Sequence, residues 1–260
     1  MNAEESKVIR ISTDQTDLIL KVGENGRLYQ TYLGEKLLHE ADVNRFSWDI
    51  HAGADGSISQ RGWEVYSGSG NEDYFEPAVA ITHNDGNTST YLYYVSSSTS
   101  PVEGGTQTTI NLRDDKYPVD VTLHYVAYPK ENVIKTWSEI KHQEKKPIVL
   151  STYASTMLYF CRSSYYLTEF SSDWAKEARM SSQQLQFGKK VIDTKLGSRA
   201  AMHTHPFFEV GLDQPVSENQ GDVLMGTLDG PVTSALRLKW IMQVTCVSFR
   251  LLIHMLPIMN

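Results

Sequence analysis

The chain has 260 residues, 40% of them hydrophobic, and a formal net charge of −7, which is ordinary for a soluble globular protein. The acidic balance and the lack of a dense Lys/Arg cluster exclude nucleic acid as an expected partner, because phosphate backbones bind basic patches. Two cysteines do not make a disulfide framework, and neither a signal peptide nor an apolar run of roughly 20 residues is found, so we expect a cytoplasmic protein without a membrane partner.

Three short strands are predicted at the start of the chain. Apolar and β-branched residues dominate Val8–Ser12, Asp17–Val22 and Arg27–Leu33, and polar turns separate these runs. Such close spacing of strands and turns is typical of an all-β sandwich or barrel.

The strand pattern breaks down from Gly34 to Ala78, in a stretch rich in glycine, aromatic and acidic residues. Its candidates for a sugar-facing site are Trp48 and Trp63, because aromatic rings beside polar groups suit the apolar face and hydroxyl rim of a sugar. The alternative is that these rings fill the space between two sheets, and we weigh the two roles evenly for Trp48 and Trp63. Packing is favoured for the other aromatic residues, Tyr66, Tyr74 and Trp174.

Strands resume at Val79–His83 and Thr90–Ser96, and the Asp85-Gly86 pair between them predicts a hairpin. Residues 96–105 are predicted as a loop rich in serine and glycine. The next strand, Thr106–Leu112, is expected to pair with the run that follows it.

The longest strand signals lie between Val119 and Leu158. Apolar residues alternate with polar ones in Val119–Tyr128, which indicates one buried and one wetter face. Together with Asn132–His142 and Pro147–Leu158, this run predicts three consecutive antiparallel strands. Strands of this length indicate a large sheet, and a second sheet is the simplest cover for its apolar face.

The last part of the chain predicts fewer elements. Tyr165–Phe170 is a strand, Asp173–Glu177 could begin one helical turn, and residues 190–194 and 206–213 are the last credible strands. The predicted fold class is therefore all-β, with large antiparallel sheets and little helix.

Few residues indicate chemistry directly. His203 and His205 would face the same side of a strand and could share a metal, but isolated histidines are far commoner than metal sites. The acids Glu72, Asp73 and Glu76 could form a carboxylate pair, although adjacent acids in a loop are more often solvated. Cys161 is expected to be a small buried hydrophobe. We predict no catalytic residue, no metal and no cofactor.

Six runs along the chain have a sequence and an order that are typical of one known family. They are Gly70–Ala78, Asp85–Tyr94, Leu112–Val119, Val121–Tyr128, Glu131–Trp137 and Asp173–Glu177. Together they resemble the amino-terminal domain of glycoside hydrolase family 36, the bacterial α-galactosidases, and the resemblance extends from Ser6 to about Leu228.

The resemblance implies a β-supersandwich of the galactose-mutarotase type. In the family a (β/α)₈ barrel follows this domain and carries two aspartates for retaining hydrolysis of terminal α-galactosides such as melibiose and raffinose. Because this chain is expected to lack that barrel, the implied role is non-catalytic, with the missing barrel, further subunits of a homo-oligomer and the galactoside as partners. Asp49, with Trp48 beside it, falls about where a loop of the family reaches the sugar site of a neighbouring subunit.

Two other functions remain open from the residues alone. The chain could be a free-standing carbohydrate-binding module with Trp48 and Trp63 as its platform. It could also be a purely structural sandwich.

The composition changes after Asp229, since no Asp or Glu follows. The family would be expected to read Gly-Trp-Thr-Gly-Asn-Phe after Leu228, and joining the third base of each codon to the first two of the next permits that reading here. Two such joins are forced: Trp240-Ile241 must give Asp, and Met242-Gln243 must give Ala. We therefore expect a domain at residues 1–228 and an aberrant apolar tail at residues 229–260, out of frame after one lost base and lacking the last strands.

Overall fold

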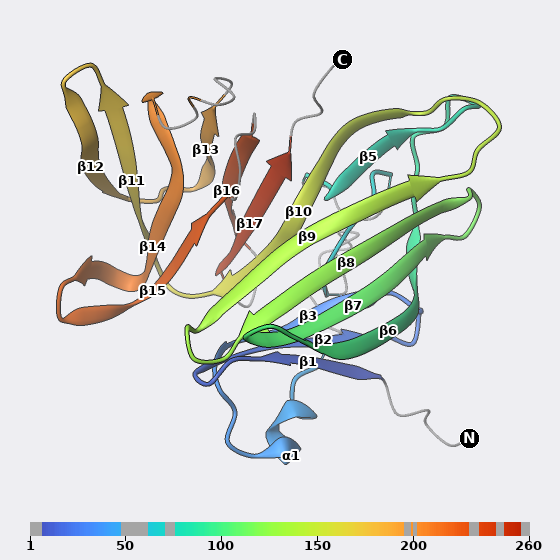
Figure 1. Cartoon of the computed structure of the whole chain (residues 1–260), viewed down its shortest axis with the longest axis horizontal. Coiled ribbons are helices and arrows are strands. Elements are labelled where there is room, and N and C mark those ends of the chain that lie inside the picture. The colour runs from blue at the N-terminus through green and yellow to red at the C-terminus, as the bar shows by residue number, and fades with distance from the viewer. Residues whose placement is uncertain are drawn as a thin grey trace. The chain divides into compact units, whose positions relative to one another are not determined.

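The computed structural model describes residues 7–47, 62–70, 76–194, 199, 202–228, 234–242 and 247–255. The chain divides into two compact units, Met1–Leu158 and Tyr159–Asn260. Within the described residues the sheets are antiparallel, and helix is confined to the four-residue α1 (Glu40–Val43) and single 3-10 turns (Figure 1). The predicted all-β class with little helix is confirmed. None of the described helices has the length and apolar character needed to cross a membrane.

The first sheet of unit 1 contains the three strands predicted at the start of the chain. Its order is β1-β2-β3-β4, and each neighbouring pair is antiparallel. The consecutive residues Leu18, Ile19 and Leu20 of β2 are all buried, so both faces of this strand are covered. The strands are β1 (Val8–Ser12), β2 (Thr16–Val22), β3 (Leu28–Glu35) and β4 (Trp63–Glu64).

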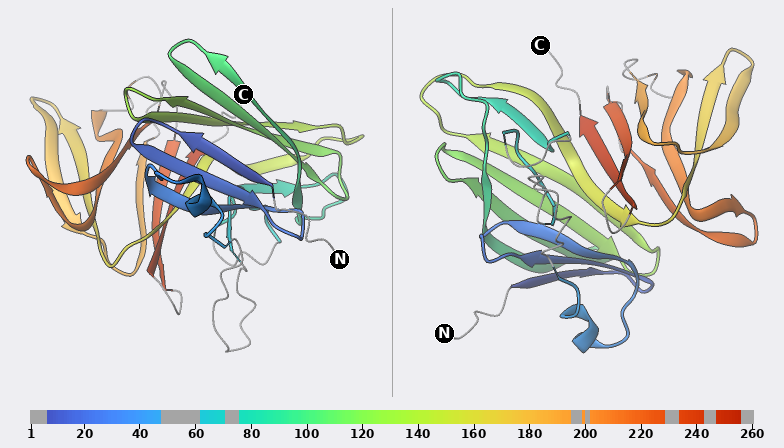
Figure 2. Two further views of the ribbon diagram at one scale, coloured as in Figure 1. Left: turned by 90° about the horizontal axis from the view of Figure 1, so that it is seen from below. Right: turned by 180° about the vertical axis from the view of Figure 1, so that it is seen from behind.

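A second, longer sheet of unit 1 lies beside the first, as both views of Figure 2 show. Its strands, in the order in which they pair, are β6 (Leu92–Val102), β7 (Gly105–Asp114), β8 (Val119–Tyr128) and β9 (Val133–His142). The predicted alternation in β8 is confirmed, because Val121, Leu123 and Tyr125 are buried whereas Thr122 and His124 are half-buried.

The prediction of a loop at residues 96–105 is wrong, because β6 continues through most of this range to Val102. Pro101 lies opposite Thr106 within this strand. β6 is the edge strand of its sheet, and an edge strand tolerates the missing N–H of proline.

Two predicted pairings in unit 1 are also wrong. The turn at Asp85-Gly86 exists, with Gly86 at φ 89°, but β5 (Val79–Thr82) pairs with β10 (Val149–Cys161) rather than with β6. For the same reason β10 does not complete the predicted three-stranded meander, although β8 and β9 do pair as expected. A strand sequence specifies how its faces alternate, but its partner depends on residues far away in the chain.

The described part of unit 2 consists of antiparallel strands, in which the hairpins β11–β12, β14–β15 and β16–β17 are joined by pairings between strands farther apart in the chain. One sheet has the order β12-β11-β14-β15, and β16 pairs with β13 on one side and with β17 on the other. Tyr165, Leu167, Phe208 and Val210 are buried on one face of the four-stranded sheet. The strands are β11 (Tyr165–Asp173), β12 (Lys176–Gln184), β13 (Gly188–Thr194), β14 (Thr204–Ser217), β15 (Gln220–Thr227), β16 (Ser234–Met242) and β17 (Val247–Met255).

Three expectations for unit 2 are corrected. The helical turn at Asp173–Glu177 is instead a tight turn between β11 and β12, with Ala175 at φ 55° and Trp174 88% exposed at its tip rather than packed. Residues 206–213 are not the last strand, since β15, β16 and β17 follow. Cys161 is exposed rather than buried, because it ends β10 with its side chain on the opposite face from buried Phe160.

Candidate functional site

The predicted sugar-facing residues lie at the ends of a stretch that leaves the first sheet of unit 1. Trp48 and Asp49 lie outside the described residues. Trp63 is described: it is half-buried in β4 and lies opposite Gln30 of β3. Both sides of residues 48–61 can therefore be followed back to the sheet that anchors them.

The far side of this stretch is anchored through Glu64. The Arg27 guanidinium donates from Nε and Nη2 to the two carboxylate oxygens of Glu64, and both side chains are largely buried. Burial opposes the charge of Arg27, but the Glu64 carboxylate outweighs it, so the pKa of Arg27 is raised. A two-pronged pair of this kind fixes orientation as well as position. It therefore sets the direction in which β4 enters the sheet.

The near side is anchored by a buried lysine. Lys21 of β2 donates from Nζ to the backbone oxygens of Phe46, at 2.7 Å, and of Asn44, at 3.2 Å. Burial lowers the pKa of Lys21 below its ordinary value. The ring of Phe46 also lies 4.8 Å from that of Tyr32 on β3. The residues just before Trp48 are thus held by charge-assisted hydrogen bonds and by an aromatic contact.

The two anchors occupy one row of the sheet. Lys21 lies opposite Tyr29, and Tyr29 lies opposite Glu64, so the three side chains share a face. All three are buried. Residues on either side of the 48–61 stretch are consequently held by side chains of one row of the sheet, and the role of these side chains is to hold the chain in position.

The other residues that the sequence singled out do not gather into a catalytic group. Glu72, Asp73 and Tyr74 lie outside the described residues, and Glu76 is half-buried. Tyr66 is 1% exposed, which confirms its predicted packing role. In the described part of the chain no cluster of three or more His, Cys, Asp or Glu side chains has the arrangement of a metal site.

A serine–histidine pair was missed by the sequence analysis. Nε2 of His205 lies 2.7 Å from Oγ of Ser172, and that oxygen also accepts a hydrogen bond from the Ala178 amide. The backbone oxygen of His203 accepts from the Ser172 amide. These bonds hold the bulged end of β11 against β14, so the pair is explained by its structural role.

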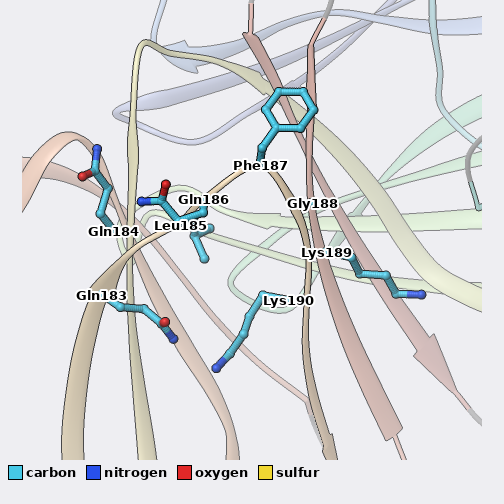
Figure 3. A pocket seen from close by; sticks show the side chains of 8 residues that line it. All are labelled: Gln183, Gln184, Leu185, Gln186, Phe187, Gly188, Lys189 and Lys190. Carbon is cyan, nitrogen blue, oxygen red and sulfur yellow. The ribbon is translucent and has the colours of Figure 1, made fainter.

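A small hollow of about 170 Å³ lies at the connection between β12 and β13 (Figure 3). Consecutive residues of one stretch line it, from Gln183 to Lys190. Figure 3 shows Phe187, Lys189 and Lys190 pointing in different directions rather than toward one centre. Ligand sites are larger, typically about 300–1,000 Å³, and have converging polar groups, so this hollow is not a candidate.

A second cluster that the sequence did not indicate lies where the turns of unit 1 meet. His83, just after β5, contacts Glu144, which is 61 residues away in the connection between β9 and β10. Nothing in either local sequence distinguishes these residues from solvated turn residues.

Comparison with known proteins shows which family this chain is similar to. Residues 26–228, more than half of the chain, match the family described as the glycosyl hydrolase family 36 N-terminal domain. Proteins named probable alpha-galactosidase C from Aspergillus terreus and Aspergillus oryzae are each 24% identical over 167 residues. That match covers 59% of this chain but only 22% of each relative.

Solved structures share the fold at low sequence identity. The GH36 alpha-galactosidase AgaA from Geobacillus stearothermophilus is 18% identical, with a TM-score of 0.81 over 95% of this chain and 37% of its own. The alpha-galactosidase from Lactobacillus brevis is 19% identical, with a TM-score of 0.80 over 96% of this chain and 36% of its own. This chain thus spans little more than a third of those structures. From the family match, the chain belongs to glycosyl hydrolase family 36 and corresponds to its N-terminal domain.

Proposed function

We propose that this chain is the non-catalytic amino-terminal part of a retaining α-galactosidase that acts on terminal α-galactosides of the melibiose and raffinose type. The family match over residues 26–228 carries the proposal. It is supported by the alpha-galactosidase names of the relatives and by a structure of AgaA in complex with raffinose. The proposed roles are packing against the catalytic barrel, oligomerisation and completion of the sugar pocket.

The packing role is supported by an exposed apolar face in unit 2. Met180 lies opposite Phe170, whose ring is 5.5 Å from that of Phe207. Met225 lies opposite Glu209, two residues along β14 from Phe207, and therefore projects from the same face. Met180 is 70% exposed and Met225 is 59% exposed. An apolar sheet face of this kind suits a partner surface, and the rest of the enzyme is the occupant we propose.

The role in the sugar pocket is supported by the two anchors of the 48–61 stretch. Lys21 and Glu64 hold its neighbouring residues at one row of the first sheet. An anchored base is what a loop requires if it carries Trp48 and Asp49 to a sugar, in the same or in a neighbouring subunit.

For the tail we propose that residues 229–260 follow a lost base near the Leu228 codon. The family match also ends at Leu228, which supports a change at that position. β16 and β17 pair with each other residue for residue, and β16 also pairs with β13, so residues 234–242 and 247–255 form strands, contrary to the expectation that the tail lacks the last strands. The nucleotide sequence decides this proposal: an alternate frame that does not encode Gly-Trp-Thr-Gly-Asn-Phe after Leu228 would refute it.

The functional proposal is tested with the purified chain and with its locus. We expect no turnover of a chromogenic α-galactoside by the chain, and an open frame for a (β/α)₈ barrel downstream of the Leu228 codon. Turnover by the chain alone, or a locus without a barrel frame, would contradict the proposal.

A carbohydrate-binding module is the second candidate, and half-buried Trp63 is the described part of its platform. Calorimetric titration with raffinose discriminates the two. Binding that is lost in Trp63→Ala but retained in Trp174→Ala would favour the module, because Trp174 is a matched indole in the other unit.

A further inference from the structure

Strand β12 forms one edge of the four-stranded sheet of unit 2. It is the terminal strand of the order β12-β11-β14-β15, and all nine of its residues are exposed. Figure 1 shows it at the outer side of this sheet, and within the described residues no strand pairs with its outer edge. An edge strand presents backbone groups with which another strand can pair, and most proteins protect such edges with charges, prolines or bulges.

The two halves of β12 differ in how well they are protected. The first half, Lys176–Arg179, carries three charged side chains and a bulge, where the register with β11 shifts and Ala178 has φ 50°. The second half, Met180–Gln184, has no charged residue, proline or glycine, and its pairing with β11 is regular. By contrast, the opposite edge strand β15 carries the charged Asp222 and two glycines, and the edge strand β6 of unit 1 has a bulge and Pro101. Met180–Gln184 is therefore an unprotected edge.

Alternate residues of this second half direct their backbone groups away from β11. The Leu185 amide donates to the backbone oxygen of Tyr165 at 2.8 Å, so Leu185 faces β11. Backbone directions alternate along an antiparallel strand, so every second residue before Leu185 faces outward. These outward residues are Gln184, Ser182 and Met180. The series ends at the bulge, because the Ala178 amide donates to Oγ of Ser172 at 2.9 Å.

A second copy of the chain is the partner that matches this edge. Two identical antiparallel strands pair about a two-fold axis, and only with Ser182 at the axis do all three outward residues meet outward residues. Ser182 then lies opposite Ser182 of the second copy, and Met180 lies opposite its Gln184. Each outward N–H meets an outward C=O. Because Met180–Gln184 carries no charge, the two copies do not repel each other where they pair.

The same pairing would cover two exposed aromatic side chains at the ends of β12. Trp174, just before the strand, is 88% exposed, and Phe187, just after it, is 60% exposed. In an antiparallel pair the beginning of one strand lies beside the end of the other, so Trp174 of each copy comes to the end from which Phe187 of the other follows. Aromatic side chains are enriched at protein–protein interfaces, so this position suits both rings.

We propose that the Met180–Gln184 edge of β12 binds a second copy of this chain, so that two four-stranded sheets join across a two-fold axis. This dimer rests on the oligomerising role proposed above and assigns a contact to it. Pairing along a short edge makes a small interface, so the dimer is expected to be reversible. Its absence would leave the proposed non-catalytic α-galactosidase part untouched, because that proposal is tested by turnover and by the locus.

Association is tested by sedimentation velocity of the whole chain from about 1 µM to about 0.1 mM, a range suited to a small interface. Ser182→Pro removes the outward N–H at the axis but no bond to β11, and it should raise the dimer Kd at least tenfold, because one hydrogen bond is lost from each copy. The control Ser182→Ala keeps that N–H and, like the proline variant, loses the contact of Oγ with Thr168. It should associate like the unmodified chain. A monomer throughout, or equal association of the two variants, would overturn the proposal.

The register is tested by thiol crosslinking with a short bis-maleimide, in a chain that also carries Cys161→Ser and Cys246→Ser. Ser182→Cys should give a crosslinked dimer, because residues that exchange both hydrogen bonds have Cα atoms about 5.5 Å apart. Gln184→Cys is the matched control on the same strand and face. Its two copies would lie about 14 Å apart, since each is opposite Met180 of the other chain. Equal crosslinking at both positions, or more at Gln184→Cys, would refute the pairing, whether or not Ser182→Pro folds.

Discussion

Asp17→Asn tests the network that holds the first sheet to the segment leading to Trp48. The Asp17 carboxylate is fully buried and accepts four hydrogen bonds. Two come from Arg10, at 3.2 and 2.7 Å, one from the Ser12 hydroxyl at 2.5 Å, and one from the Leu37 amide at 2.8 Å. In the variant an NH₂ group replaces one of the two carboxylate oxygens. That group then faces either the donors of Arg10 and Leu37 or those of Arg10 and Ser12, so two donors lose their acceptor.

The expected cost follows from this geometry. Breaking a buried charged pair by changing one partner costs about 3–5 kcal/mol, and the retained amide oxygen should keep the loss near the lower end, about 3 kcal/mol. With a urea slope of about 2 kcal/mol per molar, the unfolding midpoint should fall by about 1.5 M at neutral pH. The control is Asp14→Asn, which changes an exposed acid in the adjacent turn and should alter stability by about 0.5 kcal/mol or less.

The pH dependence gives a second, independent readout. Burial would raise the pKa of Asp17, but the bonds from Arg10, Ser12 and Leu37 outweigh it, and the pKa is lowered. A lowered folded-state pKa adds stability that is complete above the unfolded value of about 3.9 and is lost as the pH falls through the folded value. The difference in the free energy of unfolding between the unmodified chain and Asp17→Asn should therefore become smaller below about pH 4. A difference in the free energy of unfolding that stays constant in acid would refute this reasoning, and so would a loss of stability at neutral pH of only about 0.5 kcal/mol or less.

Three further predictions concern unit 1. The Tyr66 and Ser138 hydroxyls both donate to the backbone oxygen of Ala154, at 2.8 and 2.7 Å. Tyr66→Phe and Ser138→Ala should therefore each lower the free energy of unfolding in urea by about 1 kcal/mol. The double variant should cost about 1 kcal/mol more than their sum, because the oxygen then has neither hydroxyl donor, and simple additivity would contradict this. Lys21→Met should speed amide exchange in residues 44–47 without changing β8, and equal effects in both regions would argue against a local anchor. Gly68→Ala should destabilise by about 2 kcal/mol or more, since its Cβ would lie 2.1 Å from a backbone oxygen; an unchanged melting temperature would show that the chain shifts freely there.

The sequence by itself determined the strands and their faces wherever alternation is local. The alternation of Val121, Leu123 and Tyr125 with Thr122 and His124 was enough to predict which side of β8 is buried, because successive side chains of a strand point to opposite faces. The resemblance to family 36 also rested on short runs in order along the chain, and it was confirmed. The sequence favoured packing for Tyr66, which was confirmed, but it could not decide between a sugar-facing and a packed role for Trp63.

The tertiary structure decided which strands pair and which polar residues meet. β5 pairs with β10 instead of forming a hairpin with β6, and the pairing of Lys21 with the backbone of Phe46 has no local signal. His83 and Glu144 are 61 residues apart, and each resembles an ordinary turn residue until the fold removes both from water. The physical reason is common to these cases: alternation and turn propensity are set by neighbours in sequence, whereas strand partners, buried charges and shared protons depend on what the folded chain brings together.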